Sequence, residues 1–142
     1  MLAENDQVLD LIPQRSPMVM IHKLVSCDEE ITVSNFKILS DNIFIEDGFI
    51  AAAGLVENIA QTAAARVGFI CQQQQIPVPL GYIGAVKNLE VLFLPAINSI
   101  LKTTVKIIHQ VFDVTVIEGI IYCDGQIAAK CEMKIFIQNN KN

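Results

Sequence analysis

The chain lacks tryptophan, and among its 142 residues it has only two histidines and four cysteines. The histidines stand alone in the sequence, and no two cysteines have the C-x-x-C spacing of a metal or redox motif. We therefore expect no metal site, no cofactor and no disulfide framework. The cysteines are interpreted as buried apolar residues in a reducing compartment; they are Cys27, Cys71, Cys123 and Cys131.

Basic residues are scarce as well, since ten Lys and Arg stand against fifteen Asp and Glu and give a net charge of −5. They are scattered along the chain without a basic stripe, which argues against nucleic acid as a partner. Long apolar runs are missing too, because Glu57 and Arg66 interrupt the best candidate for a membrane span. The N-terminal segment has no basic start followed by an apolar core, so we expect no signal peptide and a cytoplasmic protein.

What the chain has in abundance is apolar character, with 52% hydrophobic residues and a mean hydropathy of +0.45. Its length fits one domain, which we place at residues 1–142. This hydrophobicity is high for a small soluble protein, and it indicates apolar surface buried between subunits. We therefore expect a homodimer or a higher oligomer.

One long helix is predicted within residues 47–75, which read DGFIAAAGLVENIAQTAAARVGFICQQQQ. Alanine-rich sequence without proline favours helix, because Ala loses no side-chain entropy there. Apolar residues cover this helix nearly all round, so neighbouring elements should enclose it on most sides. Only strands are available to enclose it.

Glu57 is the exception inside this apolar helix, and Gln61 lies one turn further on the same face. A buried carboxylate needs a partner, because desolvating its charge is costly. The pair therefore has two interpretations. Glu57 is either a satisfied buried carboxylate at a backbone or dimer contact, or it belongs to a functional site.

The other segments read as strands, most of them with clear turn signals between them. Residues 18–27 and 31–39 form a hairpin across an acidic connection, and Asp124-Gly125 predicts another hairpin. A bulge is expected near Gly119, and Gly81 and Gly84 would let a ligand approach the strand at 80–92. A long helix among long antiparallel strands predicts an α+β protein with the hotdog fold, a curved antiparallel sheet wrapped around a central helix.

Three segments carry a family resemblance that covers nearly the whole chain. They are the run from Leu11 to Met18, which reads LIPQRSPM, then Asp47-Gly48 with Gly54 to Gln61, and Gly81 to Lys87. The chain thereby resembles the hotdog-fold dehydratases that act on 3-hydroxyacyl groups carried by acyl carrier protein. It looks nearest to their divergent branch of the aryl polyene type.

The resemblance implies a site at the start of the helix, shared between two subunits. Glu57 would position the substrate hydroxyl or act as its acid, and backbone N–H groups of residues 48–53 would bind the enolate-like oxygen. Asp47 and Gln14 complete the catalytic candidates. The predicted substrate contacts are Gly48, Phe49, Gly54, Gln61 and Gly84.

The chain departs from the family where its catalytic histidine should stand. The Gly-His-Phe-Pro motif is replaced around Asp47, and the Pro-His-Arg turn of the divergent branch carries Gln14, whose amide cannot act as a general base. His22 and His109 match no family position and are interpreted as structural.

Three functions therefore stay open for an acyl thioester substrate, expected on acyl carrier protein. They are a dehydratase using Glu57 with Asp47 or another base, a thioesterase using Glu57 and Asp47, and a non-catalytic binder. The binder would be the inactive half of a heterodimer whose active paralogue brings the histidine. Arg15, Arg66 and Lys87 are the cations expected near the mouth of an acyl tunnel, where they could meet an acidic carrier.

Overall fold

The structure, a computed structural model, describes residues 1–138 of the chain. Eleven helices and strands make up this part, and the second helix is by far the longer of two. In chain order they are β1 (Ala3–Glu4), α1 (Asp6–Leu9), β2 (Lys23–Cys27), β3 (Ile31–Lys37), β4 (Ile45–Glu46), β5 (Phe49–Ile50), α2 (Ala52–Gln73), β6 (Leu80–Val91), β7 (Ile100–Val111), β8 (Val114–Cys123) and β9 (Gln126–Gln138).

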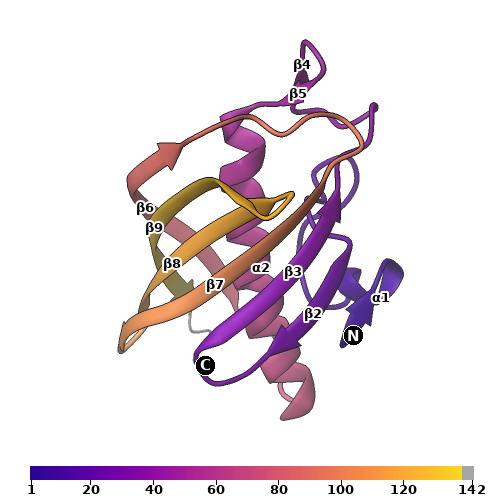
Figure 1. Ribbon diagram of the computed structural model, residues 1–142. Helices are drawn as coiled ribbons and strands as arrows, with labels where there is room; N and C mark the ends of the chain where they lie inside the picture. Colours follow the sequence, from indigo (N-terminus) through magenta and orange to yellow (C-terminus); the bar gives the residue numbers. More distant parts are fainter. Residues whose placement is uncertain (139–142) are drawn as a thin grey trace.

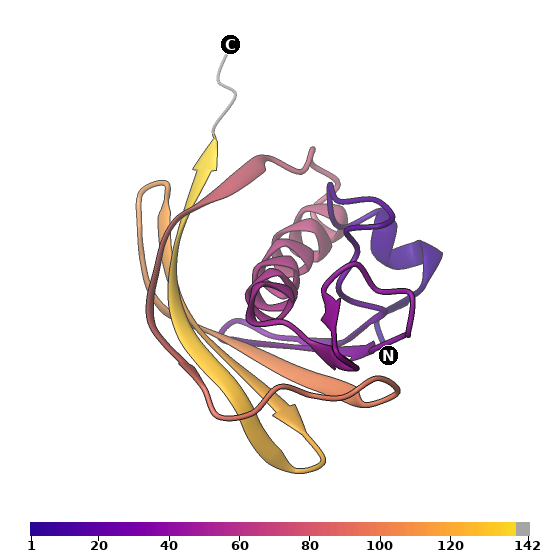
Figure 2. The same cartoon turned by 90° about the horizontal axis from the view of Figure 1, so that it is seen from above.

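A seven-stranded antiparallel sheet curves around α2 (Figures 1 and 2). The strand order is β1-β2-β3-β7-β8-β9-β6, and β4 and β5 form a separate small hairpin. Seen from above, the sheet bends round one side of α2, while the N-terminal segment lies on the other side (Figure 2). This arrangement confirms the predicted hotdog fold.

The core joins the buried face of α2 to the concave face of the sheet, which is the face turned toward α2. Leu55 and Ile59 of α2 are fully buried against inward residues such as Leu101, Val105 and Ile121. Burying side chains of this size stabilises the fold by roughly 1.5–3 kcal/mol each. Within residues 1–138, no helix is both long and apolar enough to cross a lipid bilayer.

Gly119 does not form the predicted bulge. It lies within the regular β8–β9 pairing opposite Cys131, and a Cβ at this position would overlap the side chain of Ile59 on α2. Irregular pairing occurs elsewhere, in the β2–β3, β6–β9, β7–β8 and β8–β9 pairs, for example between Ile107 and His109 of β7. Gly119 is therefore a close-packing position that lets the helix approach the sheet.

Two hairpins were predicted and are present, β2–β3 across the acidic connection and β8–β9 across Asp124-Gly125, whereas the β7–β8 turn was not predicted. Asp124 and Gly125 have φ values of 53° and 76°, as the Asp-Gly signal indicates. The turn between β7 and β8 contains Phe112, which has φ 54° and a side chain that is 96% exposed. Because this turn contains an apolar residue, the hydrophobic pattern of the sequence does not show that β7 ends there.

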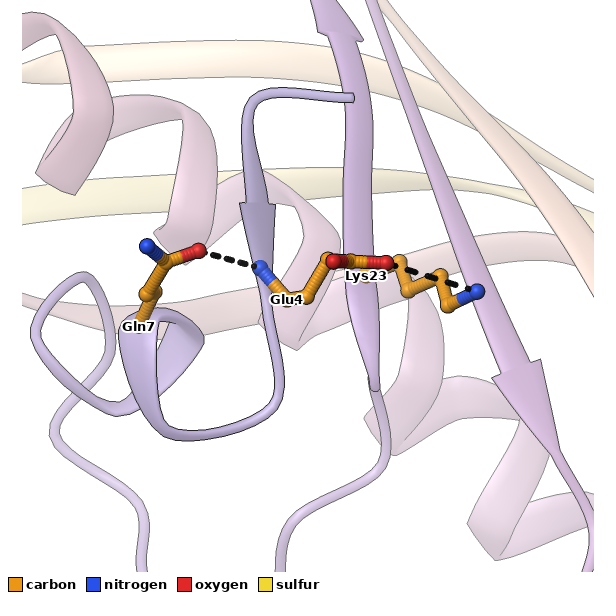
Figure 3. A network of polar contacts seen from close by, with 3 residues as sticks. All are labelled: Glu4, Gln7 and Lys23. Carbon is orange, nitrogen blue, oxygen red and sulfur yellow. Dashed lines mark hydrogen bonds and ion pairs between the residues drawn. The ribbon is translucent and has the colours of Figure 1, made fainter.

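β2 begins at Lys23 and not at Met18, as the sequence had suggested. It pairs with β3 on one side and with the short β1 on the other. At this outer edge, the Gln7 side chain accepts a hydrogen bond from Glu4 N over 3.1 Å, and Lys23 Nζ lies 3.6 Å from Glu4 Oε1 (Figure 3). The ion pair is exposed, so it contributes little to stability.

The four cysteines are free thiols, and three of them are buried, as the sequence predicted. Cys27 is the exception and is half-buried. Cys131 lies in the core at 2% exposure, and this burial raises the pKa of its thiol to about 11. Such a thiol stays protonated near neutral pH and is a poor nucleophile.

Candidate functional site

A cavity of about 490 Å³ separates one side of α2 from the concave face of the sheet. Its polar lining residues are Gln14, Glu57, Arg66, Gln110 and Thr115, and nearly all the others are apolar. Gly81, Tyr82 and Gln110 are exposed members of the lining, so they mark its opening to solvent. The cavity thus combines a few polar groups with a long apolar wall, which is the usual character of a small-molecule site.

The wall that α2 contributes is one helical face, because its lining residues recur at intervals of three and four. They are Glu57, Ala60, Ala63, Ala64, Arg66, Val67, Ile70 and Cys71. From Glu57 to Cys71 the helix rises by roughly 21 Å, at 1.5 Å per residue. The alanines leave room beside the helix, so a long apolar chain could lie along it with one end at Glu57.

Gln61 fixes the orientation of the Glu57 carboxylate. Its Nε2 donates to Glu57 Oε1 over 2.8 Å and to Met18 O over 2.7 Å, and its Oε1 accepts from Met20 N over 2.6 Å. Both amide hydrogens are therefore used by the protein, and the side chain is fully buried. Gln61, predicted as a substrate contact, has no hydrogen left to offer a ligand.

Asn58 joins the same turn of α2 to the strands. Its Nδ2 donates to Met20 O over 2.7 Å, and its Oδ1 accepts from Thr103 Oγ1 over 2.5 Å. The backbone at Met18 and Met20 thus bonds to α2 side chains instead of a neighbouring strand, which is why β2 starts later than expected. These bonds hold the segment after Pro17 against the helical turn that carries Glu57.

Gln14 enters the cavity from the turn that precedes this segment. Arg15 stabilises the turn, because its Nη1 donates to Ile12 O over 2.9 Å and to Gln14 O over 2.7 Å. The side-chain oxygen of Gln14 is buried and has no hydrogen-bond partner within residues 1–138. The structure therefore places Gln14 and Glu57, two of the three predicted catalytic residues, on the same cavity.

The third candidate, Asp47, lies elsewhere. Asp47 and Gly48 form the turn between β4 and β5 with φ values of 52° and 86°, and Asp47 is exposed. Phe49 follows in β5 and is 47% exposed. The helix begins at Ala52, within the predicted range of residues 47–75, and the small β4–β5 hairpin takes up the preceding residues.

The cavity is not lined by Asp47, Gly48, Phe49 or Gly54. Gly54 is a packing position in the first turn of α2, since a Cβ there would come within 2.8 Å of Ile50 and Phe44. The start of α2 is therefore outside the cavity in this chain. None of residues 48–53, from which the N–H donors were expected, lines the cavity that Glu57 lines.

The surroundings of Gly84 also differ from those expected. The ring of Phe136 lies over it and would overlap a Cβ at this position, and the same ring stacks on Tyr82 with centroids 5.5 Å apart. The space predicted for a ligand is taken by an aromatic side chain. Gly81, three residues earlier, lines the cavity instead.

No histidine lines the cavity within the described part of the chain. His22, which directly precedes β2, is half-buried; its ring lies 4.5 Å from Phe36 and its Nδ1 accepts from Lys37 N over 3.2 Å. Burial lowers the pKa of His22, and the charge of Lys23 adds to this effect. His109 is exposed on β7. Among the described residues, Glu57 is the one carboxylate that lines the cavity.

The cations expected at a tunnel mouth have other partners. Arg66 lines the cavity, but its Nη2 donates to Glu29 O over 2.8 Å and its Nη1 to Asp28 O over 2.5 Å. It therefore ties the β2–β3 turn to α2. Arg15 is engaged with carbonyls, as described above, and Lys87 lies on the outer face of β6 opposite Glu132.

Most strand residues of the cavity were not predicted from the sequence; they are Tyr82, Ile83, Ile107, Gln110, Thr115, Ile117, Ile135 and Ile137. Their inward phase is visible from alternation along each strand. Which part of a strand faces open space, however, depends on how far the sheet bends away from α2. Alternation carries no information about that distance.

Both the sequence and the fold of this chain are similar to those of known proteins. Residues 6–142 match the sequence profile of the ApeP-like family, which is described as ApeP dehydratase. No curated protein matches the chain by sequence. The fold is similar to a chain of the dehydratase heterocomplex ApeI:P from Xenorhabdus doucetiae, with a TM-score of 0.87 and 17% identity over 94% of this chain and 91% of that one.

Two further solved structures share the fold at greater distance. A hypothetical thioesterase from Streptococcus pneumoniae, solved with coenzyme A, has a TM-score of 0.68 and 13% identity over 84% of this chain and 88% of that one. The PaaI protein of Escherichia coli has a TM-score of 0.63 and 15% identity over 80% of this chain and 81% of that one. At such identities the likeness shows the fold alone.

Proposed function

Because this chain belongs to the ApeP-like dehydratase family, we propose that it binds a 3-hydroxyacyl thioester in the cavity and supports its dehydration. One observation carries the proposal. The Glu57 carboxylate is held by Gln61 at one end of an apolar cavity whose helical wall runs for several turns. An acyl chain would lie along that wall, with its 3-hydroxyl beside the carboxylate.

Glu57 supplies the acid–base chemistry in this proposal. Its carboxylate takes the proton from C2 of the acyl chain, the C2–C3 double bond forms as the C3–O bond breaks, and the same proton leaves with the hydroxyl as water. One group can do both steps because the proton removed from C2 is the one that the leaving hydroxyl needs. Gln14, at the place of the family histidine, cannot take part as a base.

The proposed assembly is a dimer or heterodimer built along β6. This strand pairs only with β9, so one long edge is unpaired within residues 1–138. Exposed apolar side chains accompany it, among them Leu80, Tyr82 and Leu89. Long unpaired edges of this kind associate readily with another strand. A second subunit there would lie beside the cavity, and a paralogue could add the missing histidine.

The experiment follows both possible products from one substrate. The purified chain is incubated with a 3-hydroxyacyl pantetheine thioester, alone and with acyl carrier protein as carrier, and enoyl thioester and free thiol are measured together. Enoyl product that Glu57→Gln removes is the expected result. An unchanged rate in Glu57→Gln would contradict the assigned role.

Two other outcomes identify the alternatives. Release of thiol without enoyl product would indicate a thioesterase, with Glu57 activating water. Tight binding without either product would indicate an acyl-binding subunit, which the absence of a cavity histidine favours. Adding a histidine-bearing paralogue and regaining dehydration would then assign the chain to a heterodimer.

A further inference from the structure

The side chain of Gln14 presents its amide nitrogen to the cavity, and not its oxygen. The oxygen Oε1 is buried and sealed from contact, whereas Nε2 is not among the sealed atoms of residues 1–138. No residue of that part of the chain bonds to Nε2, so both of its N–H groups are available. An amide nitrogen only donates hydrogen bonds. A molecule in the cavity that pairs with Gln14 must therefore bring an acceptor.

Glu57 presents the opposite character to the same cavity. Gln61 Nε2 donates to its Oε1 over 2.8 Å, which leaves Oε2 without a partner in the described chain and open to contact. A carboxylate oxygen accepts hydrogen bonds and can take up a proton. The cavity thus combines a base at Glu57 with an N–H donor at Gln14.

This combination matches what proton removal beside a carbonyl requires. As a base takes the proton from C2, negative charge develops on the carbonyl oxygen, and a donor directed at that oxygen stabilises the charge. We propose that Gln14 Nε2 donates a hydrogen bond to the thioester carbonyl oxygen while Glu57 takes the C2 proton. Gln14 itself neither gives nor takes a proton. The inference rests on the proposed function, because it concerns the same site.

The other donors near the substrate are placed less well for this role. Residues 48–53 do not line the cavity, and Arg66 lines it with a guanidinium group that is bonded to the β2–β3 turn. The polar side chains of β6, β7 and β8 lie across the cavity from α2. Gln14, by contrast, belongs to the N-terminal segment that hydrogen bonds attach to the helical turn of Glu57.

Binding of two unreactive analogues tests the hydrogen bond apart from catalysis. Both are saturated acyl pantetheines of equal length without a 3-hydroxyl, so neither can lose water. The ketone analogue has CH₂ in place of the sulfur and keeps the carbonyl, whereas the thioether analogue has CH₂ in place of the carbonyl. In calorimetric titrations wild type should bind the ketone analogue about tenfold more tightly, which corresponds to one hydrogen bond in a buried site.

Gln14→Met keeps the length of the side chain and removes both N–H groups. It should bind the two analogues equally, with the affinity of wild type for the thioether, and that retained affinity shows that the site is folded. Gln110→Met removes another amide of the same cavity and is the matched control, which should keep the ketone preference. Equal binding of the two analogues by wild type would overturn the inference, and so would a ketone preference that survives in Gln14→Met.

Hydrogen exchange at C2 measures the catalytic part of the inference. In D₂O wild type should exchange the C2 hydrogens of the saturating ketone analogue, as followed by NMR, and Glu57→Gln should not. Gln14→Met should exchange them about 100-fold more slowly, the usual effect of losing one donor to a developing oxyanion. An unchanged exchange rate in Gln14→Met would refute the role in charge stabilisation. If Gln14→Met loses the ketone preference while wild type neither exchanges C2 hydrogens nor forms enoyl product, the proposed reaction fails and the hydrogen bond stands.

Discussion

At the scale of single residues, the site depends on amides that the protein uses to hold a carboxylate. The Gln61 side chain forms hydrogen bonds with Glu57, Met18 and Met20. It joins the helix, the N-terminal turn and the acidic group in one network, and all of its hydrogen-bonding atoms are buried. Networks of this kind fix geometry as well as stability, because each partner left alone would be costly.

Replacing Gln61 by Leu should therefore lower both stability and activity. Met18 O and Met20 N would lose their partner, and at about 1–3 kcal/mol for each unsatisfied group the free energy of unfolding should fall by about 2–6 kcal/mol. Urea denaturation measures this loss. Gln73→Leu at the exposed end of α2 is the matched control and should change stability by less than about 0.5 kcal/mol. Equal effects of the two variants would argue against the network.

His22 makes stability depend on pH. Burial lowers its pKa in the folded chain below the ordinary value of 6.5, so the folded state prefers the neutral ring. The stability this provides is present above the unfolded pKa and is lost as the pH falls below it. Wild type should lose melting temperature between pH 7.5 and pH 5, and His22→Gln should lose less. Parallel profiles for the two proteins would exclude His22 as the cause.

At the scale of elements, α2 is placed by two close approaches that only glycine allows. On one side Gly119 of β8 lies against Ile59, and on the other Gly68 of α2 lies against the backbone of Leu11. Leu11 and Gln14 both line the cavity, so the second contact also sets the position of the turn that carries Gln14. The sheet bends away from α2 beyond these contacts, and this separation creates the cavity.

Gly68→Ala tests the second contact against helix propensity. In an isolated helix this change would stabilise by about 1 kcal/mol. Here the new methyl group would overlap the carbonyl of Leu11, so we expect a loss of about 1–3 kcal/mol and weaker acyl binding. Thermal melting and ligand titration measure the two effects. Ala53→Gly, at an exposed position of the same helix, should cost only about 0.5–1 kcal/mol and leave binding unchanged.

At the scale of the whole molecule, charge is segregated in a way that the linear sequence conceals. Every lysine within residues 1–138 lies on a strand and points to the convex face of the sheet, the face turned away from α2. These lysines are Lys23, Lys37, Lys87, Lys102, Lys106, Lys130 and Lys134. Four glutamates share the face, Glu4, Glu90, Glu118 and Glu132, so seven minus four leaves three positive charges there on a chain of net charge −5.

The convex face should therefore bind anionic surfaces that the net charge alone would repel. We expect the protein to be retained on a sulfonate resin at pH 7 in low salt, despite its sequence pI of about 4.9. The triple variant Lys37→Gln, Lys102→Gln, Lys106→Gln should elute at lower salt, and the corresponding Lys→Arg triple should elute with wild type. Wild type in the flow-through would show that the segregation is too weak to act.

The sequence by itself determined much of this protein. Alternation in the strands, the Asp124-Gly125 turn and the alanine-rich helix identified the fold, because local propensity and the burial of one face agree at each of these places. The motif around Gln14 and the Glu57–Gln61 spacing identified the family and two of the residues on the cavity. These features are local, so they can be seen without coordinates.

Only the tertiary structure decided the rest. Asp47 lies on a hairpin turn away from the cavity, and the ring of Phe136 covers Gly84. The side chain of Gln61 forms all of its hydrogen bonds with the protein. The fold also gathered scattered lysines on one face, because a strand alternates its side chains and neighbouring strands align in register. Distances between segments remote in sequence depend on how sheet curvature and helix packing combine, and no single segment encodes that combination.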